Sequence, residues 1–448
     1  MTMHSAYING EYVTGKGSQI TLVNPAKPSD TFEYAAATTA DLENAITGAK
    51  AAYKQWSQLT PAVRSAALLK FADAIAADST KLTELEVRES GKPVAVFRDG
   101  ELPFAVDNLK YFAAAARSLD GTGAGVLSDG YTSMLIKRPI GIVGSIAPWN
   151  FPLIMAIWKF GPALAAGNAV ILKPAPSTPS TALRMAELAV QSGLPKGLLN
   201  VLSGDDDLGK ALVAHKDIAM ISVTGATTTG QAIMAEASKT TKRLHLELGG
   251  KAPVVVFNDA DLEAAAAGIA IAGFFNSGQD CTAATRVLVQ EGVYEEMVKL
   301  LAHQATNEIA VGMPNEDVIV GPVNNAAQFE RVKGFLNRVP SHARVVAGGS
   351  ALDRPGYFIA PTVIADLRQQ DEHIQSEIFG PVITIQKFKD EAEAIALSNG
   401  VEYGLASSVW TKDHGRAMRM AKAFDFGVVW INTHIPMVAE MPHGGFKH

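Results

Sequence analysis

The chain has 448 residues, of which 48% are hydrophobic and 19% are charged, and its formal net charge at neutral pH is −6. This length exceeds that of one ordinary hydrophobic core, so we expect two or three globular domains. The mild negative charge gives no basic footprint for nucleic acid, and no apolar run approaches the ~20 residues of a membrane span. Nucleic-acid and membrane partners are therefore not expected.

Cys281 is the only cysteine, so the chain cannot form an internal disulfide, which is typical of a reducing compartment. The first residues, MTMHS, lack the charged and apolar regions of a signal peptide. Both features predict a cytoplasmic location. The ten histidines are scattered without the spacing of metal ligands, so no metal site is expected.

The first part of the chain, residues 40–118, predicts helices. Residues 39–43, with the sequence TADLE, read as a capped helix start, and residues 64–78 have helical spacing. Residues 119–137 follow neither a helical nor a strand pattern, so we interpret them as an excursion from the main body.

Two units follow, and in each of them strands alternate with helices. Short apolar runs predict strands at 140–146, 169–172, 199–202, 219–223 and 244–248, with helices at 180–192, 207–215 and 228–239 between them. In the second unit the strands are expected at 253–257, 285–290, 382–388, 406–410 and 428–432, and the helices at 262–276, 293–310, 326–339, 390–399 and 414–426. This order predicts an α/β fold with largely parallel sheets, and the first unit has the rhythm of a dinucleotide-binding domain.

Cys281 closes the segment FFNSGQDC, and Glu247 stands upstream of it in the segment ELGGK. A thiol nucleophile and an acid–base carboxylate are the groups needed to oxidise an aldehyde through a thioester. The two motifs at this spacing resemble the aldehyde dehydrogenase superfamily, and the resemblance runs along nearly the whole chain. It implies a Rossmann-type dinucleotide-binding domain at 1–118 and 138–247, an oligomerisation hairpin at 119–137, and a catalytic α/β domain at 248–448.

The resemblance also implies the roles of the catalytic residues. Cys281 would attack the aldehyde carbon, and Asn150, in the segment PWNFP, would hold the oxyanion together with the Cys281 backbone N–H. After hydride transfer, Glu247 would activate the water that hydrolyses the thioester. Lys173, in the segment LKP, is included among both the catalytic and the cofactor residues. Its family counterpart contacts the adenosine ribose.

The implied cofactor is NAD, with NADP as a possibility. Glu377 and Phe379, in the segment EIFGP, would contact the nicotinamide ribose and pack beside it, and Thr224 and Gly225 would precede the helix that receives the pyrophosphate. The remaining cofactor residues are Trp149, Gly204 and Leu248. Three positions depart from the family pattern, namely Pro176, Asp206 and Ala226, which leaves the choice between NAD and NADP open. We expect NAD to be preferred because no arginine stands nearby to pair with an extra phosphate.

The segment 278–284 and the tail 430–445 resemble bacterial 4-aminobutyraldehyde dehydrogenases. Asp280, directly before the nucleophile, would raise the pKa of the thiol and repel anions, or would face a cationic group of the substrate. The aromatic residues Phe151, Trp158 and Trp430 are candidates for holding an ammonium group by cation–π attraction. Asp107 is a candidate for a second anion, with a solvated helix face as its alternative.

Other functions stay open at this stage. Betaine aldehyde and succinate semialdehyde are alternative substrates, although no arginine pair for the latter is evident, and a non-catalytic structural protein of the same fold is a distant alternative. A homo-oligomer is expected. The chain ends in GGFKH, inside a turn that the family writes G-G-[FY]-K-x-S-G, so the family's C-terminal oligomerisation strand is expected to be missing and a dimer is favoured over a tetramer.

Overall fold

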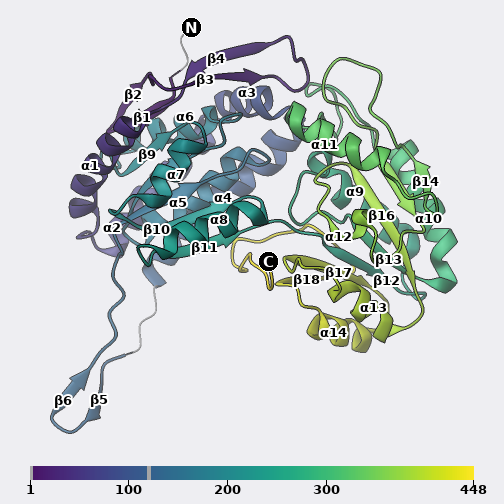
Figure 1. Cartoon of the computed structure of the whole chain (residues 1–448). Coiled ribbons are helices and arrows are strands. Elements are labelled where there is room, and N and C mark those ends of the chain that lie inside the picture. Colours follow the sequence, from purple (N-terminus) through teal and green to yellow (C-terminus); the bar gives the residue numbers. More distant parts are fainter. Residues whose placement is uncertain (1–3, 119–122) are drawn as a thin grey trace.

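The computed structural model describes residues 4–118 and 123–448, which form two lobes, each built on a seven-stranded sheet (Figure 1). The purple-to-teal N-terminal lobe carries a hairpin that projects away from the body, and the C-terminus returns to the region between the lobes (Figure 1). Among the described residues, no helix combines the length and the hydrophobicity that a bilayer span needs.

The first sheet has the strand order β11-β10-β7-β8-β9-β1-β2. The five strands from β11 to β9 are parallel, whereas β1 is antiparallel to both β9 and β2. The strands are β1 (Ala6–Ile8), β2 (Glu11–Val13), β7 (Ile142–Ile146), β8 (Ala169–Lys173), β9 (Leu199–Leu202), β10 (Ile218–Thr224) and β11 (Arg243–Glu247). Because the chain order reverses between β7 and β10, this border is a topological switch point, where open α/β sheets bind ligands.

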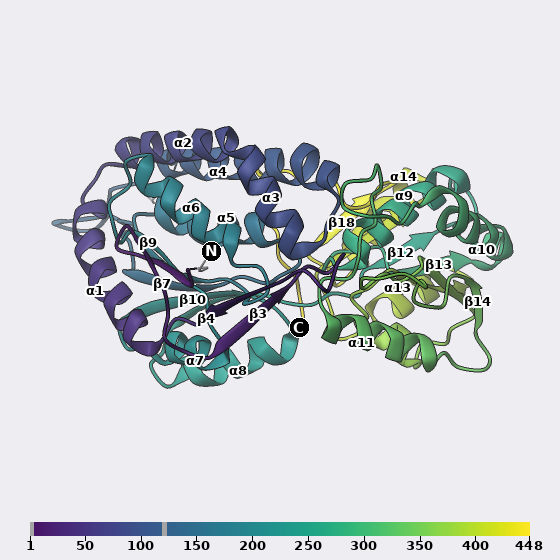
Figure 2. The ribbon, with the colours of Figure 1, turned by 90° about the horizontal axis from the view of Figure 1, so that it is seen from above.

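Helices cover both faces of the first sheet (Figure 2). One face carries α2 (Pro61–Ala77), α3 (Ser79–Ser90), α4 (Leu102–Ala115), α5 (Pro152–Ala165) and α6 (Ser180–Gln191); the other carries α1 (Thr39–Trp56), α7 (Asp206–Ala214) and α8 (Thr227–Ser238). Side chains satisfy the first N–H groups of two of these helices, since Thr38 and Asp41 form a capping box on α1 and Asp205 accepts from Leu208 at α7.

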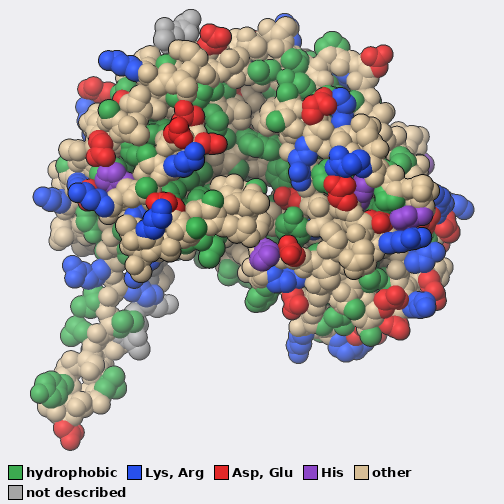
Figure 3. All heavy atoms as spheres, in the orientation of Figure 1, with side chains coloured by type: hydrophobic (Ala, Val, Ile, Leu, Met, Phe, Trp, Pro, Cys, Tyr) green, Lys and Arg blue, Asp and Glu red, His purple; other side chains and the backbone are tan. Residues whose placement is uncertain are grey.

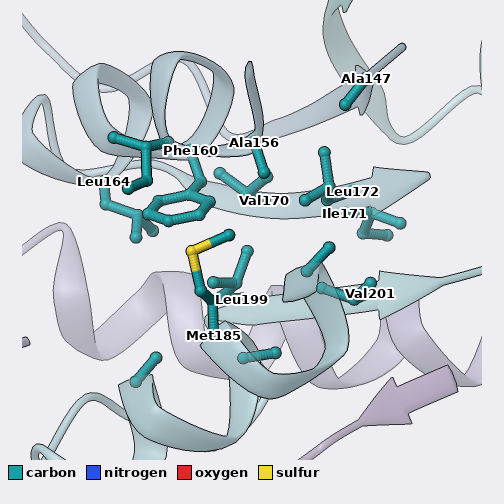
Figure 4. Close-up of a cluster of buried hydrophobic side chains, with 14 of the residues drawn as sticks. Ala147, Ala156, Phe160, Leu164, Val170, Ile171, Leu172, Met185, Leu199 and Val201 are labelled. Atoms are coloured by element: carbon teal, nitrogen blue, oxygen red, sulfur yellow. The ribbon is translucent and has the colours of Figure 1, made fainter. Parts of the chain in front are cut away.

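A dry core joins the helices to the sheet. Figure 4 shows Phe160 of α5 and Met185 of α6 pointing toward each other beside strand residues such as Val170, and all three side chains are fully buried. Phe71 of α2 stacks on Phe160 with ring centroids 5.6 Å apart. Such close packing fixes α5, which carries residues of the site described below.

The second sheet has the order β14-β15-β16-β13-β12-β17-β18 and is parallel except for β14. Its strands are β12 (Pro253–Val256), β13 (Arg286–Gln290), β14 (Arg344–Ala347), β15 (Thr362–Ala365), β16 (Val382–Phe388), β17 (Ala406–Trp410) and β18 (Val428–Ile431). Its helices are α9 (Leu262–Phe274), α10 (Tyr294–His303), α11 (Ala326–Asn337), α12 (Glu372–Gln375), α13 (Glu391–Asn399) and α14 (His414–Ala423).

The expected elements of both units are confirmed to within a few residues, and β9, β16 and β17 have the expected bounds. The helix expected at 262–276 ends earlier, at Phe274, because Asn276 and Ser277 adopt left-handed φ angles of 49° and 58°. The helix expected at 293–310 continues beyond α10 only as a short π-helical segment, Gln304–Glu308. Sequence analysis missed β14, β15 and the N-terminal strands, including the hairpin of β3 (Gln19–Val23) and β4 (Thr31–Ala35).

The excursion expected at 119–137 is a hairpin of β5 (Gly125–Ser128) and β6 (Tyr131–Ser133) where it is described, and residues 119–122 lie outside the described residues. Its apolar side chains are exposed to solvent, and green side chains on the projection are visible in Figure 3. They are Val126, Leu127, Tyr131, Met134, Leu135 and Ile136.

The lobes meet where the chain passes from β11 to β12. Glu247 ends β11, and β12 begins at Pro253 after the segment LGGKA. A Cβ atom added at Gly250 would overlap the backbone carbonyl oxygen of Cys281. The carboxyl edge of the first sheet is therefore held against the loop that enters β13 of the second.

Replacement of Gly250 by alanine should disrupt this crossing, because backbone atoms rather than a flexible side chain occupy the space of the new methyl group. Overpacking of this kind costs about 1–3 kcal/mol. We expect a lower urea midpoint and melting temperature, as measured by circular dichroism. Gly100→Ala is the control, since its Cβ would have nothing within 4 Å. A Gly250→Ala protein as stable as this control would contradict the tight crossing.

Candidate active site

Three side chains from distant segments converge at the meeting of the lobes. Glu247 comes from the end of β11, Cys281 from the loop before β13, and His443 from the tail after β18. Their ligating atoms all lie within 4.8 Å of one another, and His443 Nε2 is 3.7 Å from Glu247 Oε1. This places a thiol, a carboxylate and an imidazole around one small space.

The Cys281 thiol sits in a negative, buried environment. Burial raises its pKa well above the ordinary value, and the charges of Glu247 and Asp280 raise it further. The thiol is therefore protonated at rest, and it becomes a nucleophile only when its proton is removed.

Glu247 is a charged base within reach of that proton. Burial alone would raise its pKa, but the neighbouring His443, the nearby Cys281 thiol and the charge of Lys159 together hold the pKa below the ordinary value. Lys159 lies on α5 and is only 3% exposed. Burial lowers its pKa to about 8, against the opposing influence of Glu247 and Cys281. An ionised carboxylate beside a thiol can accept a proton from the thiol or from water.

Asn150 lies against the loop that carries the thiol. Its side-chain amide donates to the Gln279 carbonyl oxygen at 3.0 Å, and its own backbone oxygen accepts from Asn276 Nδ2 at 2.9 Å. Among the described residues, nothing accepts a hydrogen bond from the Cys281 backbone N–H. An amide and a free N–H beside a nucleophile are the donors that stabilise an oxyanion.

The switch point of the first sheet forms the other side of the site. Lys173 ends β8 and Thr224 ends β10, while Gly225 N–H donates to the Glu247 carbonyl oxygen at 3.1 Å. The next residue, Ala226, caps α8 without a side-chain hydrogen bond, so the first N–H groups of this helix are open to a ligand. Thr227 Oγ1 is buried there and has no hydrogen-bond partner among the described residues.

Glu377 and Phe379 reach the same region from the segment before β16. Glu377 Oε1 accepts from the Gly250 N–H at 2.8 Å, and burial raises the pKa of this carboxyl to about 7. The Phe379 ring meets Trp149 edge to face with centroids 5.4 Å apart. Leu248 packs over Gly230 of α8, where a Cβ would meet its side chain. These expected cofactor residues thus lie around the crossing between the lobes.

One of the departures noted in the sequence, Asp206, lies near Lys173. Burial lowers the pKa of Lys173, while Asp206 and Asp205 act in the opposite direction. Gly204 stands just before α7, where a Cβ would meet Leu208 of that helix. The two aspartates give this end of the switch point a negative charge.

A cavity of about 930 Å³ lies beside Glu247, which is one of its lining residues. Its wall includes α4, α5, the ends of β10 and β11, and the tail 427–443. Trp158 and Trp430 are among its lining residues. Trp158 Nε1 donates to Asn108 Oδ1 at 3.1 Å, and Trp430 Nε1 donates to the Pro436 carbonyl oxygen at 2.8 Å, so both indoles are held in place.

Three expected substrate residues do not line this cavity. Asp107 is exposed, because it lies one position, about 100° of helix rotation, from the lining residue Asn108. It therefore does not serve as a second anion in this cavity, and its alternative, a solvated helix face, describes it. Phe151 instead stacks on Phe275 at 6.2 Å and lies under the Lys92 ammonium. Asp280 Oδ1 accepts from both the N–H and the hydroxyl of Thr282, at 2.8 Å each, so this carboxylate braces its own turn beside the thiol.

Sequence analysis singled out neither Lys159 nor His443 as a partner of Glu247. A signal for Lys159 was present, since it is the only charged residue of the apolar helix α5, PLIMAIWKFGPALA. His443 contacts the Trp158 ring at 5.1 Å between centroids. No sequence pattern around His443 predicts its place in the site, because the residues that it meets there come from distant segments of the chain.

Comparison with known proteins finds similarity along nearly the whole chain. The model of the aldehyde dehydrogenase family matches residues 12–448. A betaine aldehyde dehydrogenase of Vibrio vulnificus is 38% identical over 100% of this chain and 93% of its own length, and an aldehyde dehydrogenase of Emericella nidulans is 40% identical over 98% and 89%. Among solved structures, PnpE from Pseudomonas sp. WBC-3 matches with a TM-score of 0.96 and 37% identity over 100% of this chain and 93% of PnpE, and PnpE has also been solved with nicotinamide adenine dinucleotide.

Alkylation of the single thiol measures its electrostatic environment directly. Glu247→Gln removes a neighbouring negative charge, so the pKa of Cys281 should fall and iodoacetamide should react faster at pH 7–8. A shift of half to one unit gives roughly a three- to tenfold increase. The rate can be followed by intact mass. Slower alkylation would instead show that Glu247 takes the proton from the thiol.

Proposed function

We propose that this chain, which belongs to the aldehyde dehydrogenase family, oxidises aldehydes that carry a cationic group, with 4-aminobutyraldehyde or a related ω-aminoaldehyde as the best match. As a member of that family it is an enzyme that uses NAD to oxidise an aldehyde. The aminoaldehyde proposal is carried by the cavity beside Glu247, whose wall holds Trp158, Trp430 and Tyr111 and whose lining includes the exposed carboxylate of Glu440. Each aromatic face attracts a cation by about 0.5–2 kcal/mol.

The proposed catalytic roles follow from the geometry. Cys281 adds to the aldehyde carbon after losing its proton, and the new oxyanion is held by the Asn150 amide and the Cys281 N–H. Once the hydride of this adduct has been transferred, a thioester remains, and Glu247 takes a proton from the water that hydrolyses it. The neighbouring His443, with a smaller contribution from the charge of Lys159, holds the pKa of Glu247 low and so keeps this carboxylate ionised between these steps.

The residues at the switch point fit NAD. The uncapped first turn of α8 offers donors to a pyrophosphate, as does the Thr227 hydroxyl, which has no hydrogen-bond partner in the described part of the chain. In this proposal Lys173 would contact the adenosine ribose, and Glu377 and Phe379 would contact the nicotinamide ribose. NAD, when bound, accepts the hydride of the aldehyde, and the chain's own residues only hold and orient it.

The domain roles and the assembly belong to the same proposal. Residues 1–118 and 138–247 form the dinucleotide-binding domain, and residues 248–448 form the catalytic domain. The exposed apolar hairpin around β5 and β6 supports its use as a contact between copies in a homo-oligomer.

Betaine aldehyde is the second candidate substrate. Two relatives from Vibrio vulnificus, each 38% identical, are betaine aldehyde dehydrogenases. A trimethylammonium group is also a cation and suits an aromatic wall. Succinate semialdehyde is disfavoured, because Glu440, Glu247 and Asp280 would all repel its carboxylate.

An aldehyde panel tests the proposal. The wild-type enzyme should show a higher kcat/KM for 4-aminobutyraldehyde and betaine aldehyde than for uncharged butyraldehyde. Glu440→Gln should raise KM for the two cations roughly two- to fivefold and leave butyraldehyde unchanged, because only a charge is removed from the lining. Glu402→Gln, another exposed carboxylate that lies outside the lining, is the control. Equal KM changes for charged and uncharged aldehydes would remove the support for a cationic substrate.

The cofactor preference depends on the negative charge near Lys173. Asp206→Asn should improve the use of NADP relative to NAD by roughly fivefold, since the extra phosphate would meet one carboxylate fewer. Asp207→Asn is the matched control, because Asp207 is exposed, pairs with Lys210 and does not act on Lys173. The kcat/KM ratio for the two cofactors measures the effect. A wild-type enzyme that prefers NADP would overturn this account of the preference.

A further inference from the structure

We propose that Cys281, Glu247 and His443 form a binding site for a thiophilic divalent cation, best matched by Zn²⁺, and that the bound ion reversibly blocks the enzyme. No metal site was expected from the sequence, because these ligands come from three distant segments without ligand spacing. Only the fold brings them together.

The geometry suits a small ion. Zn²⁺ takes a thiolate, an imidazole nitrogen and a carboxylate oxygen at about 2.0–2.3 Å in a tetrahedral arrangement, which separates the ligand atoms by roughly 3.3–3.8 Å. His443 Nε2 and Glu247 Oε1 are already 3.7 Å apart, and no pair in the trio exceeds 4.8 Å. Small side-chain rotations would therefore complete three ligands and leave the fourth position for water.

Among the described residues, the carboxylate and the imidazole of this trio lack hydrogen-bond partners. Glu247 Oε1, Glu247 Oε2 and His443 Nε2 are buried and have no hydrogen-bond partner among the described residues. Buried polar atoms without partners cost about 1–3 kcal/mol each and call for a water or an ion. A water could satisfy the carboxylate and the imidazole. A metal would satisfy both and would also bind the sulfur.

The surroundings support a cation. Trp158 packs against His443 at 5.1 Å between ring centroids and orients the imidazole. Glu247, Asp280 and Glu377 all place negative charge near the sulfur, and Lys159 is the opposing positive group. The net local charge thus favours a divalent cation.

Binding is a simple exchange. The sulfur–metal bond forms as the Cys281 thiol gives its proton to the solvent, and no electrons are transferred. A sulfur engaged by the metal cannot add to an aldehyde, and a ligated Glu247 cannot activate water. The inhibition rests on the proposed roles of these two residues, whereas the metal binding does not.

Cobalt titration tests the binding alone. Metal-free enzyme without NAD or aldehyde should bind one Co²⁺ per chain and develop a thiolate-to-cobalt charge-transfer band in the near ultraviolet. His443→Phe, which keeps a ring against Trp158, should weaken binding by at least about 10–100-fold, the loss caused by removing even an outer partner of a metal ligand. His245→Phe is the matched control, since His245 lines the same cavity but is not one of the three ligands.

Zinc inhibition tests the consequence. Zn²⁺ should inhibit the wild type and His245→Phe at low concentration, a chelator should restore activity, and His443→Phe should need at least 10-fold more Zn²⁺. Melting curves establish that the variants are folded. Equal cobalt affinity in wild type and His443→Phe, or a spectrum without the thiolate band, would overturn the site. A normal cobalt site with uninhibited turnover would instead refute the proposed roles of Cys281 and Glu247.

Discussion

The crossing between the two lobes depends on the two glycines that follow Glu247. A Cβ at Gly249 would meet the Glu377 carboxylate at 2.6 Å, and one at Gly250 would overlap the Cys281 carbonyl. Because neither position carries a side chain, β11 can end directly against the loop that holds the thiol. The carboxyl edge of the first sheet thereby meets the loop leading into the second, and the groups of the site come within a few ångströms.

The proximity of these groups creates an electrostatic conflict that the fold maintains. Burial and neighbouring carboxylates raise the pKa of Cys281, whereas His443 and Lys159 keep the pKa of Glu247 low. The resting site thus pairs a protonated nucleophile with an ionised base. Within the described residues, buried polar atoms of Glu247 and His443 have no hydrogen-bond partner, so the resting fold lacks the stabilisation that such bonds would give. Such a loss of stability is typical of functional sites.

Much of this organisation follows from local sequence. Apolar runs and turn residues fix the strands, so β16 and β17 match their expected bounds, and the segments around Glu247, Cys281 and Asn150 do meet. Side-chain direction was harder to predict. Asp107 and Asn108 are neighbours in the chain, yet only Asn108 faces the cavity, because helix rotation separates them. Lys159 and His443 were missed as partners of Glu247, since their importance comes from contacts across the fold.

The central claim is that an acyl group passes through Cys281 and is released by Glu247. Its most direct measurement is the intact and peptide mass of Glu247→Gln mixed rapidly with NAD and 4-aminobutyraldehyde, with Cys281→Ala as the control. The account predicts about one NADH per chain and an acyl mass on the peptide containing Cys281, with neither in the control. NADH formation without an adduct on that peptide, or an equal signal in Cys281→Ala, would contradict it.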